Sequence, residues 1–222
     1  EAVSFFERVA GKIAIETLLP SWLIFSEGFK TSPLRSFSKR AIDIVLSFGL
    51  LIINLPTFAL AALAIRIDST GGVLFRQKRT GLNGKEFELL KFRSMVEGAE
   101  SESGPTWARM DDPRITRVGK FVRRSSLDEF PQLFNVLRGD MSLVGPRPEM
   151  PWLVQRYEPW QCKRFAVPQG ITGWWQVNGR SDKMMHEHTE EDLYYIQNYS
   201  LLLDLQILWK TIGAVIKRSG AY

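Results

Sequence analysis

Cysteine and histidine are scarce in this chain. Its 222 residues include one cysteine, Cys162, and two histidines. A single cysteine cannot form an intrachain disulfide, so a disulfide-stapled secreted scaffold is excluded and a reducing compartment is the simpler interpretation. The sequence also lacks a GxxxxGK phosphate-binding loop, a CxxC pair and a Ser-His-Asp order. Any chemistry must therefore come from other residues, chiefly carboxylates and basic side chains.

What the chain has in quantity is apolar and basic residues. Hydrophobic residues make up 45% and charged residues 24%, which excludes a disordered or low-complexity chain and provides for one ordinary domain with a sizeable core. Lys and Arg number 29 against 24 Asp and Glu, a formal net charge of +5. This excess suggests an acidic partner, and charge alone leaves nucleic acid, anionic lipid and a phosphorylated small molecule open.

One apolar run is long enough to enter a membrane. Residues 44–65 carry no charge, and about 20 such residues match the hydrocarbon thickness of a bilayer. Lys39 and Arg40 precede the run and Arg66 follows it, so the positive-inside rule favours neither end. Pro56 near the middle removes a backbone hydrogen bond, and Asn54 is placed to satisfy a freed carbonyl. A bent helix with both ends in the cytoplasm and a plain single-pass anchor are both consistent with these features.

Local patterns predict several further elements. Two alternating runs around the turn at residues 81–84 predict a β-hairpin, with Lys91 on its second strand. An apolar stripe over residues 201–215 predicts a core-facing helix near the C-terminus. The N-terminal residues 1–38 have helical apolar spacing up to Pro20, which is typical of an interfacial helix and equally of a helix that packs on a core or partner.

Adjacent carboxylates stand out at residues 128 and 129. Ser125 and Ser126 precede Asp128 and Glu129 at capping-box spacing, which predicts that both acids lie in the first turn of a helix ending at Gly139. Acids in that position commonly only complement the helix dipole. The neighbourhood is unusually cationic, however, and such a setting suits a magnesium diphosphate site. An exposed basic face against anionic lipid is the alternative. The basic residues are Arg114, Arg117, Lys120, Arg123, Arg124 and Arg147, the last between Pro146 and Pro148.

Several long segments occur in the order and spacing of a known family. They are KRAIDIVLS, LFRQKRTGLNGKEFELLKFRSM, DPRITRVGKFVRRSSLDEFPQLFNVLRGDMSLVGPRPE, GITGWWQVNGRS and YSLLLDLQILWKTI. Over roughly residues 38–222 the chain resembles the bacterial sugar transferases, which are monotopic polyprenyl-phosphate phosphoglycosyltransferases. Residues 1–37 resemble the linker of larger members, so the resemblance implies the C-terminal catalytic part of a larger protein.

The resemblance implies a reaction and a set of site residues. A phosphosugar passes from a nucleoside-diphosphate sugar, usually UDP-linked, to polyprenyl phosphate, and nucleoside monophosphate is released. Asp128 would be the nucleophile that forms a phosphosugar-aspartyl intermediate, and Glu129, with Asp128, would hold Mg²⁺. Lys91, Arg123 and Arg147 would bind phosphate groups. This would be the first membrane step of polysaccharide or glycoconjugate assembly.

The resemblance also implies an α+β fold in which a re-entrant membrane helix joins a small cytoplasmic domain of a β-hairpin and several amphipathic helices. The expected boundaries are 1–38 for the linker, 39–67 for the membrane helix and 68–222 for the catalytic domain. The expected location is the bacterial inner membrane, with the catalytic domain on its cytoplasmic face and membrane lipid as a partner. No nucleic-acid partner is expected, and a homo-oligomer remains open.

Two positions depart from the family pattern, and two other functions remain in competition. Leu55 stands where the family often has Ser before the membrane proline, and Pro168-Gln169 stand where it commonly has Arg-Pro. The competing functions are a membrane-anchored glycosyltransferase that releases nucleoside diphosphate and a non-enzymatic basic scaffold at anionic lipid. The released nucleotide distinguishes the three: monophosphate, diphosphate or none.

Overall fold

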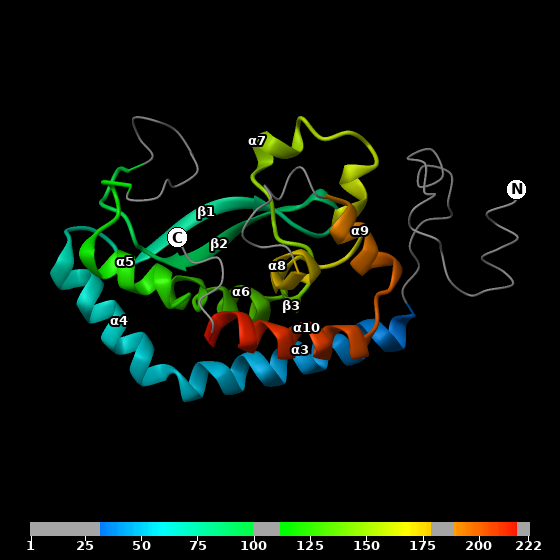
Figure 1. Cartoon of the computed structure of the whole chain (residues 1–222), viewed down its shortest axis with the longest axis horizontal. Coiled ribbons are helices and arrows are strands. Elements are labelled where there is room, and N and C mark those ends of the chain that lie inside the picture. The colour runs from blue at the N-terminus through cyan, green and yellow to red at the C-terminus, as the bar shows by residue number, and fades with distance from the viewer. Residues whose placement is uncertain (1–31, 100–111, 179–188, 217–222) are drawn as a thin grey trace, which may run out of the picture.

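The computed structural model describes residues 32–99, 112–178 and 189–216, and the predicted N-terminal helix lies outside these ranges. The described chain mixes helices with two small sheets, which confirms the α+β class (Figure 1). In chain order the elements are α3 (Pro33–Ile53), α4 (Leu55–Asp68), β1 (Leu74–Thr80), η2 (Leu82–Gly84), β2 (Glu86–Phe92), α5 (Arg117–Arg124), η3 (Leu127–Glu129), α6 (Gln132–Arg138), β3 (Ser142–Val144), α7 (Pro151–Val154), η4 (Gln161–Ala166), β4 (Gly170–Thr172), α8 (Trp174–Asn178), α9 (Thr189–Gln197) and α10 (Leu201–Ile216).

The apolar run forms two helices that meet at a sharp bend. The axes of α3 and α4 differ by 62° across Asn54, and Pro56 in the first turn of α4 has no N–H to continue the ladder. The Asn54 side-chain amide donates to the Leu50 carbonyl at 2.9 Å, which also accepts from the Asn54 backbone N–H at 3.0 Å. The prediction that Asn54 satisfies a carbonyl freed by Pro56 was therefore wrong, because the carbonyl without its helical donor is that of Ile52, four residues before the proline. Among the described helices, none alone is long and apolar enough to cross a bilayer; α3 and α4 pass that test only as a bent pair.

Buried polar contacts tie α3 to the rest of the protein. The Lys39 ammonium donates to the Val144 carbonyl at 2.9 Å and pairs with Asp204 of α10 at 2.7 Å. Asp43, one turn later, accepts from the backbone N–H of Leu143 at 3.0 Å. Arg40 donates to the last carbonyls of α6 at Val136 and Leu137. The two basic residues that precede the apolar run are thus engaged in protein contacts.

The hairpin forms where the sequence predicts it. Strands β1 and β2 pair antiparallel, from Leu74 opposite Phe92 to Thr80 opposite Glu86. The turn at residues 81–84 needs two left-handed positions, and Asn83 (φ 55°) and Gly84 (φ 76°), residue types that tolerate this conformation, occupy them. The hairpin places Lys91 beside η3, the short turn that carries both candidate acids.

A second sheet joins two distant segments. Strands β3 and β4 are parallel, with Ser142 opposite Gly170 and Val144 opposite Thr172. Beyond β3 the backbones approach so closely that a Cβ at Gly170 would lie 2.1 Å from the Gly145 nitrogen. A side chain at either glycine would push the strands apart. This contact positions the 145–149 turn, and with it Arg147, against η3.

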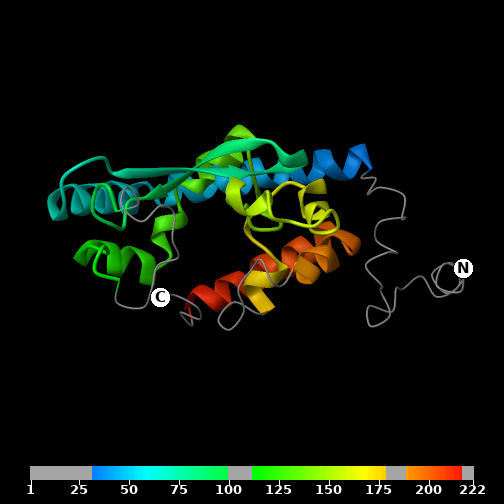
Figure 2. The same cartoon turned by 90° about the horizontal axis from the view of Figure 1, so that it is seen from above.

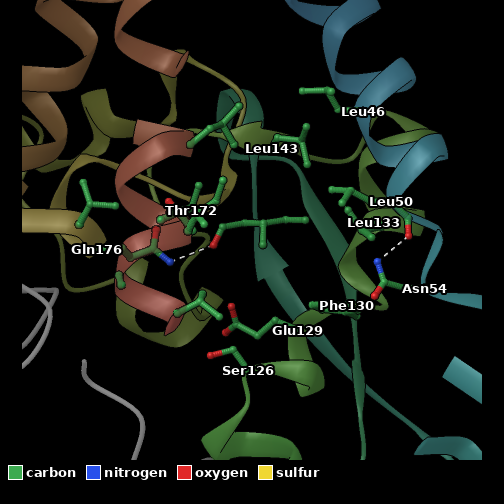
Figure 3. Close-up of a pocket in the computed structure, with 17 residues that line it drawn as sticks. Leu46, Leu50, Asn54, Ser126, Glu129, Phe130, Leu133, Leu143, Thr172 and Gln176 are labelled. Carbon is green, nitrogen blue, oxygen red and sulfur yellow. Dashed lines mark hydrogen bonds between the residues drawn. The ribbon is translucent and has the colours of Figure 1, made fainter. Parts of the chain in front are cut away.

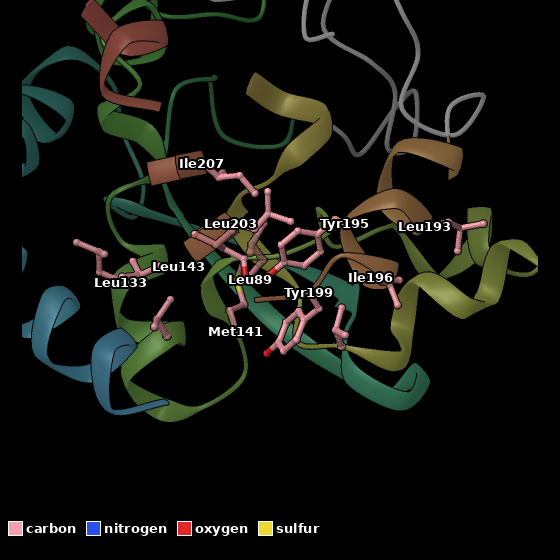
Figure 4. Close-up of a cluster of buried hydrophobic side chains, with 13 residues drawn as sticks. Leu89, Leu133, Met141, Leu143, Leu193, Tyr195, Ile196, Tyr199, Leu203 and Ile207 are labelled. Atoms are coloured by element: carbon pink, nitrogen blue, oxygen red, sulfur yellow. Dashed lines mark hydrogen bonds between the residues drawn. The ribbon is translucent and has the colours of Figure 1, made fainter. Parts of the chain in front are cut away.

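The main core lies where β2, β3, α6, α9 and α10 meet (Figure 4). Leu203 and Ile207 of α10 are buried in it, whereas Leu205, Ile212 and Val215 of the predicted stripe are exposed by 53%, 55% and 41%. The prediction that this whole stripe faces the core was therefore wrong. The helix is apolar on more than one side, so periodicity could not identify the buried face. The remaining core residues are Leu89, Leu133, Val136, Met141, Leu143, Val144, Val167, Leu193, Tyr195, Ile196 and Tyr199.

Candidate active site

The adjacent acids lie in a short 3₁₀ turn, not in the first turn of a capped helix. Ser126 adopts a left-handed conformation (φ 56°) and makes no capping bond, and the hydroxyl of Ser125 donates backward to the Phe121 carbonyl at 2.8 Å. Turn η3 then carries Asp128 and Glu129, and α6 begins three residues after the second acid and ends at Gly139 as predicted. The capping-box prediction was wrong because both serines serve the end of α5 and the tight turn that follows it.

Glu129 is held by two cations from separate elements. Its Oε1 atom lies 3.1 Å from the Lys91 ammonium on β2 and 2.6 Å from Nη2 of Arg147. These contacts are charge-assisted and partly buried. Glu129 raises the pKa of Arg147, whereas burial lowers the pKa of Lys91 despite the attraction of Glu129. Glu129 therefore fixes the position of both cations beside its neighbour.

Asp128 is in a different state from Glu129. Within the described ranges, no hydrogen bond or ion pair holds its carboxylate. Burial raises the pKa of Asp128 from its ordinary value of 3.8 to about 6, because desolvation of the charged form outweighs the attraction of Lys91. At neutral pH it is an ionised carboxylate in a partly desolvated setting, without a hydrogen bond or ion pair to the described residues. A carboxylate in this state is available to react with an electrophile or to bind a cation.

A polar cleft of about 600 Å³ opens on this side of η3. The cleft is lined by Asp128, Lys91, Arg123 and Arg147. Glu129 is not among the lining residues, but it pairs with two of these cations, Lys91 and Arg147. In the described part of the chain, Nη1 of Arg123 is buried and has no hydrogen-bond partner. The fold thus brings all the predicted site residues together. The other predicted basic residues are not among those that line the cleft, and Arg114 instead pairs with Asp112 at 2.7 Å.

A buried polar network holds the Arg147 turn, and sequence reasoning missed it. Arg164 is completely buried, donates to the Arg147 carbonyl at 3.0 Å and pairs with Asp192 at 2.6 Å. Arg79 of β1 donates to the Pro148 carbonyl at 3.3 Å and lies 4.0 Å from Glu149. Nothing in the local sequence marks Arg164 as buried. The one sequence feature that pointed to a polar network at this turn was the acidic residue Glu149, next to Pro148.

The atypical Gln169 also has a structural role. Its side-chain amide donates to the carbonyls of Arg164 at 3.0 Å and Val167 at 2.9 Å, and the side chain is fully buried. Because β4 begins at the next residue, Gln169 links the Arg164 segment to the second sheet.

Comparison with known proteins identifies the class. Residues 34–218 match the bacterial sugar transferase family, and the chain belongs to that family. It is similar to the UDP-N-acetylgalactosamine-undecaprenyl-phosphate N-acetylgalactosaminephosphotransferase of Aeromonas hydrophila, with 38% identity over 97% of this chain and 51% of that protein. The UDP-glucose:undecaprenyl-phosphate glucose-1-phosphate transferase of Escherichia coli is 42% identical over 83% of this chain and 41% of that protein.

A shorter relative is matched from end to end. The exopolysaccharide production protein ExoY of Sinorhizobium fredii is 36% identical over 95% of this chain and 100% of that protein. The chain therefore spans about half the length or less of the two larger transferases and the whole length of ExoY.

Proposed function

We propose that this protein transfers a phosphosugar from a nucleoside-diphosphate sugar, UDP-linked as in the names of two relatives, to polyprenyl phosphate. The observation that carries the proposal is the unclamped carboxylate of Asp128 facing a polar cleft whose wall holds three cationic side chains. A diphosphate needs such a concentration of positive charge, and a covalent route needs a nucleophile that is not already held by hydrogen bonds. The relatives named for this transfer support the same reaction.

The proposed chemistry proceeds by two displacements at phosphorus. A carboxylate oxygen of Asp128 attacks the phosphorus bonded to the sugar, the P–O bond to the second phosphate breaks, and nucleoside monophosphate leaves with the electron pair. A phosphate oxygen of the acceptor then attacks the same phosphorus, the aspartyl O–P bond breaks, and the carboxylate is restored. The Asp128 oxygen is the nucleophile of the first displacement and the leaving group of the second. Phosphorus keeps its oxidation state in both steps, so no external oxidant or reductant is needed.

The cationic residues have separable roles in this scheme. Lys91 and Arg147, positioned by Glu129, face phosphate oxygens on which charge develops during each displacement. Arg123 presents a buried guanidinium nitrogen whose hydrogen-bonding capacity is open among the described residues, which suits a substrate phosphate.

The residues present fit a divalent ion such as Mg²⁺. No group of three or more metal-ligating side chains occurs in the described ranges. Mg²⁺ at phosphoryl-transfer sites, however, is typically held by one or two carboxylates together with substrate phosphates and water. Asp128, which lines the polar cleft, and the adjacent Glu129, whose Oε1 also pairs with Lys91 and Arg147, are the two carboxylates that would hold it. When bound, the ion would neutralise charge on the phosphate oxygens.

A nucleotide-release assay tests this function against its two alternatives. The purified full chain is incubated with UDP-sugar and undecaprenyl phosphate, and the released nucleotide is separated by ion-exchange chromatography. We expect UMP in amounts equal to the lipid product. UDP would indicate a glycosyltransferase that makes a glycosidic bond, and no acceptor-dependent nucleotide would indicate a basic scaffold at anionic lipid.

We further propose that the bent pair α3–α4 is a re-entrant membrane helix, that residues 39–67 form the membrane part and that residues 68–222 lie on the cytoplasmic face. The support is the 62° bend at Asn54, with the exposed apolar side chains of Val45, Ile53 and Leu60 around it. The start of α3 is bound to the catalytic core through Lys39, and a re-entrant helix keeps this start on the same side of the membrane as that core.

Cysteine labelling tests this topology. The native thiol Cys162 is exposed and must first be replaced by Ser. Single cysteines are then introduced at Ser36, before the bend, and at Ser69, after it, and intact cells are treated with a membrane-impermeant maleimide. We expect both positions to be protected until the cells are permeabilised. Labelling of one position in intact cells would establish a single-pass helix instead.

A further inference from the structure

A second cavity lies on the other side of η3. This apolar groove, of about 480 Å³, runs between α3 and α10 over the ends of β3 and β4 (Figure 3). Leu46 and Leu50 form one wall, and Leu208, Ala214 and Val215 form the other. The two helices overlap in Figure 1, but the view from above in Figure 2 separates them.

The inner end of the groove reaches the candidate active site. Glu129 and Ser126 line the groove there, while Asp128, the next residue to Glu129, lines the polar cleft. The two cavities therefore meet at η3, with one acid of the pair in each. Figure 3 shows Glu129 and Ser126 together at one end of the groove, away from Leu46 and Leu143.

The polarity of the groove changes along its length. Its surface is almost entirely apolar, although Asn54, Thr172, Gln176 and Thr211 are also among the lining residues, and Leu46, Leu50 and Ile212 remain 39%, 43% and 55% exposed. At its inner end, Glu129 is neutralised by Lys91 and Arg147, and the Ser126 hydroxyl provides a donor. A matching ligand has one long apolar chain and a single anionic end.

We infer that the apolar groove seats the isoprenoid units next to the phosphate of the acceptor lipid, so that the chain of the acceptor approaches η3 from the side opposite to the polar cleft. This inference rests on the proposed function. In this arrangement the chain leaves between α3 and α10 toward the membrane, and the phosphate extends past the inner end of the groove to attack the phosphorus carried by Asp128 in line, from the place that the nucleoside monophosphate has left. The isoprenoid chain and the nucleotide thus occupy separate cavities, while the two phosphates use one position beside one nucleophile in turn.

A groove-filling variant tests the inference. Ala214→Phe places a ring on the groove wall, and Ala59→Phe makes the same change at an exposed position of α4 that does not line the groove. Leu46→Trp fills the groove from the opposite wall and serves if Ala214→Phe does not fold. Each variant is measured for binding of fluorescent polyprenyl phosphate in detergent, for UMP release from donor alone in a single turnover, and for acceptor KM.

Ala214→Phe is expected to weaken polyprenyl phosphate binding and raise the acceptor KM about tenfold or more, since displacing two buried methylene units from the groove accounts for that factor. Donor-only UMP release should change less than about twofold, because the polar cleft is untouched. Ala59→Phe should match wild type in all three measurements.

The other outcomes are decisive in different ways. Unchanged acceptor binding in both folded groove variants would overturn the inference and leave the proposed function intact. The groove variants are also tested for binding to phospholipid vesicles that contain no acceptor. Loss of this vesicle binding, with unchanged acceptor binding in detergent, would assign the groove to bulk acyl chains and would also overturn the inference. Absence of donor-only UMP release in wild type would contradict the covalent route, whereas the binding comparison would still decide where the acceptor lies.

Discussion

Asp128→Asn is expected to reduce turnover by at least roughly a thousandfold, the scale typical for removal of a covalent nucleophile. The substitution preserves the shape of the side chain but removes the carboxylate that attacks phosphorus. Turnover is measured as acceptor-dependent UMP release. Glu88→Gln, an exposed acid-to-amide change on β2, is the matched control and should leave turnover within about twofold.

The covalent intermediate can be observed directly for the same variant. With donor labelled in both the sugar and the phosphate next to it, and without acceptor, wild type should retain both labels after denaturation, and Asp128→Asn should retain neither. Equal labelling of the two proteins would contradict the assignment. Normal turnover in the variant would show that Asp128 is not the nucleophile.

The pH dependence of stability and activity gives a further check on Asp128. Its pKa is raised to about 6, so the folded state holds a proton that the unfolded state releases between about pH 4 and 6. The free energy of unfolding therefore falls as pH rises through this window. At pH 7.5, Asp128→Asn should melt at the same temperature as wild type or higher, and the advantage should vanish below about pH 4. In wild type, kcat/KM should fall as pH drops through about 6.

Arg147→Lys is expected to lower kcat/KM by about a hundredfold while the protein stays folded. The guanidinium binds Glu129 at 2.6 Å and also lines the polar cleft, and its planar fork can serve both partners at once. A lysine ammonium has a single charged centre and would have to abandon one of them. The measurements are donor KM, kcat and the melting temperature.

Arg138→Lys, an exposed change at the end of α6, is the control for this charge-preserving substitution and should behave as wild type. If Arg147→Lys turns over at a near-normal rate, then Arg147 belongs to the support of Glu129 alone. A variant that melts far below wild type would show that the contact to Glu129 is needed chiefly for folding.

Features set by neighbouring residues were predictable. The hairpin register follows from alternation around the 81–84 turn, the bend follows from Pro56, and the end of α6 follows from Gly139. In each case the deciding interaction spans only a few residues, so local backbone preferences determine it. The identity of the site residues was accessible for another reason, the resemblance of long segments to the bacterial sugar transferases.

Features that depend on distant partners were not predictable. The buried state of Arg164, the pairing of β3 with β4 and the buried face of α10 each join segments far apart along the chain. The conformation of the acid pair also escaped local rules, since capping-box spacing at Ser125 and Ser126 is compatible with a helix start and with the 3₁₀ turn that forms.

The sequence by itself determined which residues carry charge, where the chain turns and where it is apolar enough for a membrane. Only the tertiary structure decided that Glu129 is clamped while Asp128 is not, because that difference depends on where β2 and the 145–149 turn bring Lys91 and Arg147. The tertiary structure alone also placed Asp128 in the polar cleft and Glu129 in the apolar groove. Desolvation and charge pairing act through space, and distance along the chain does not encode them.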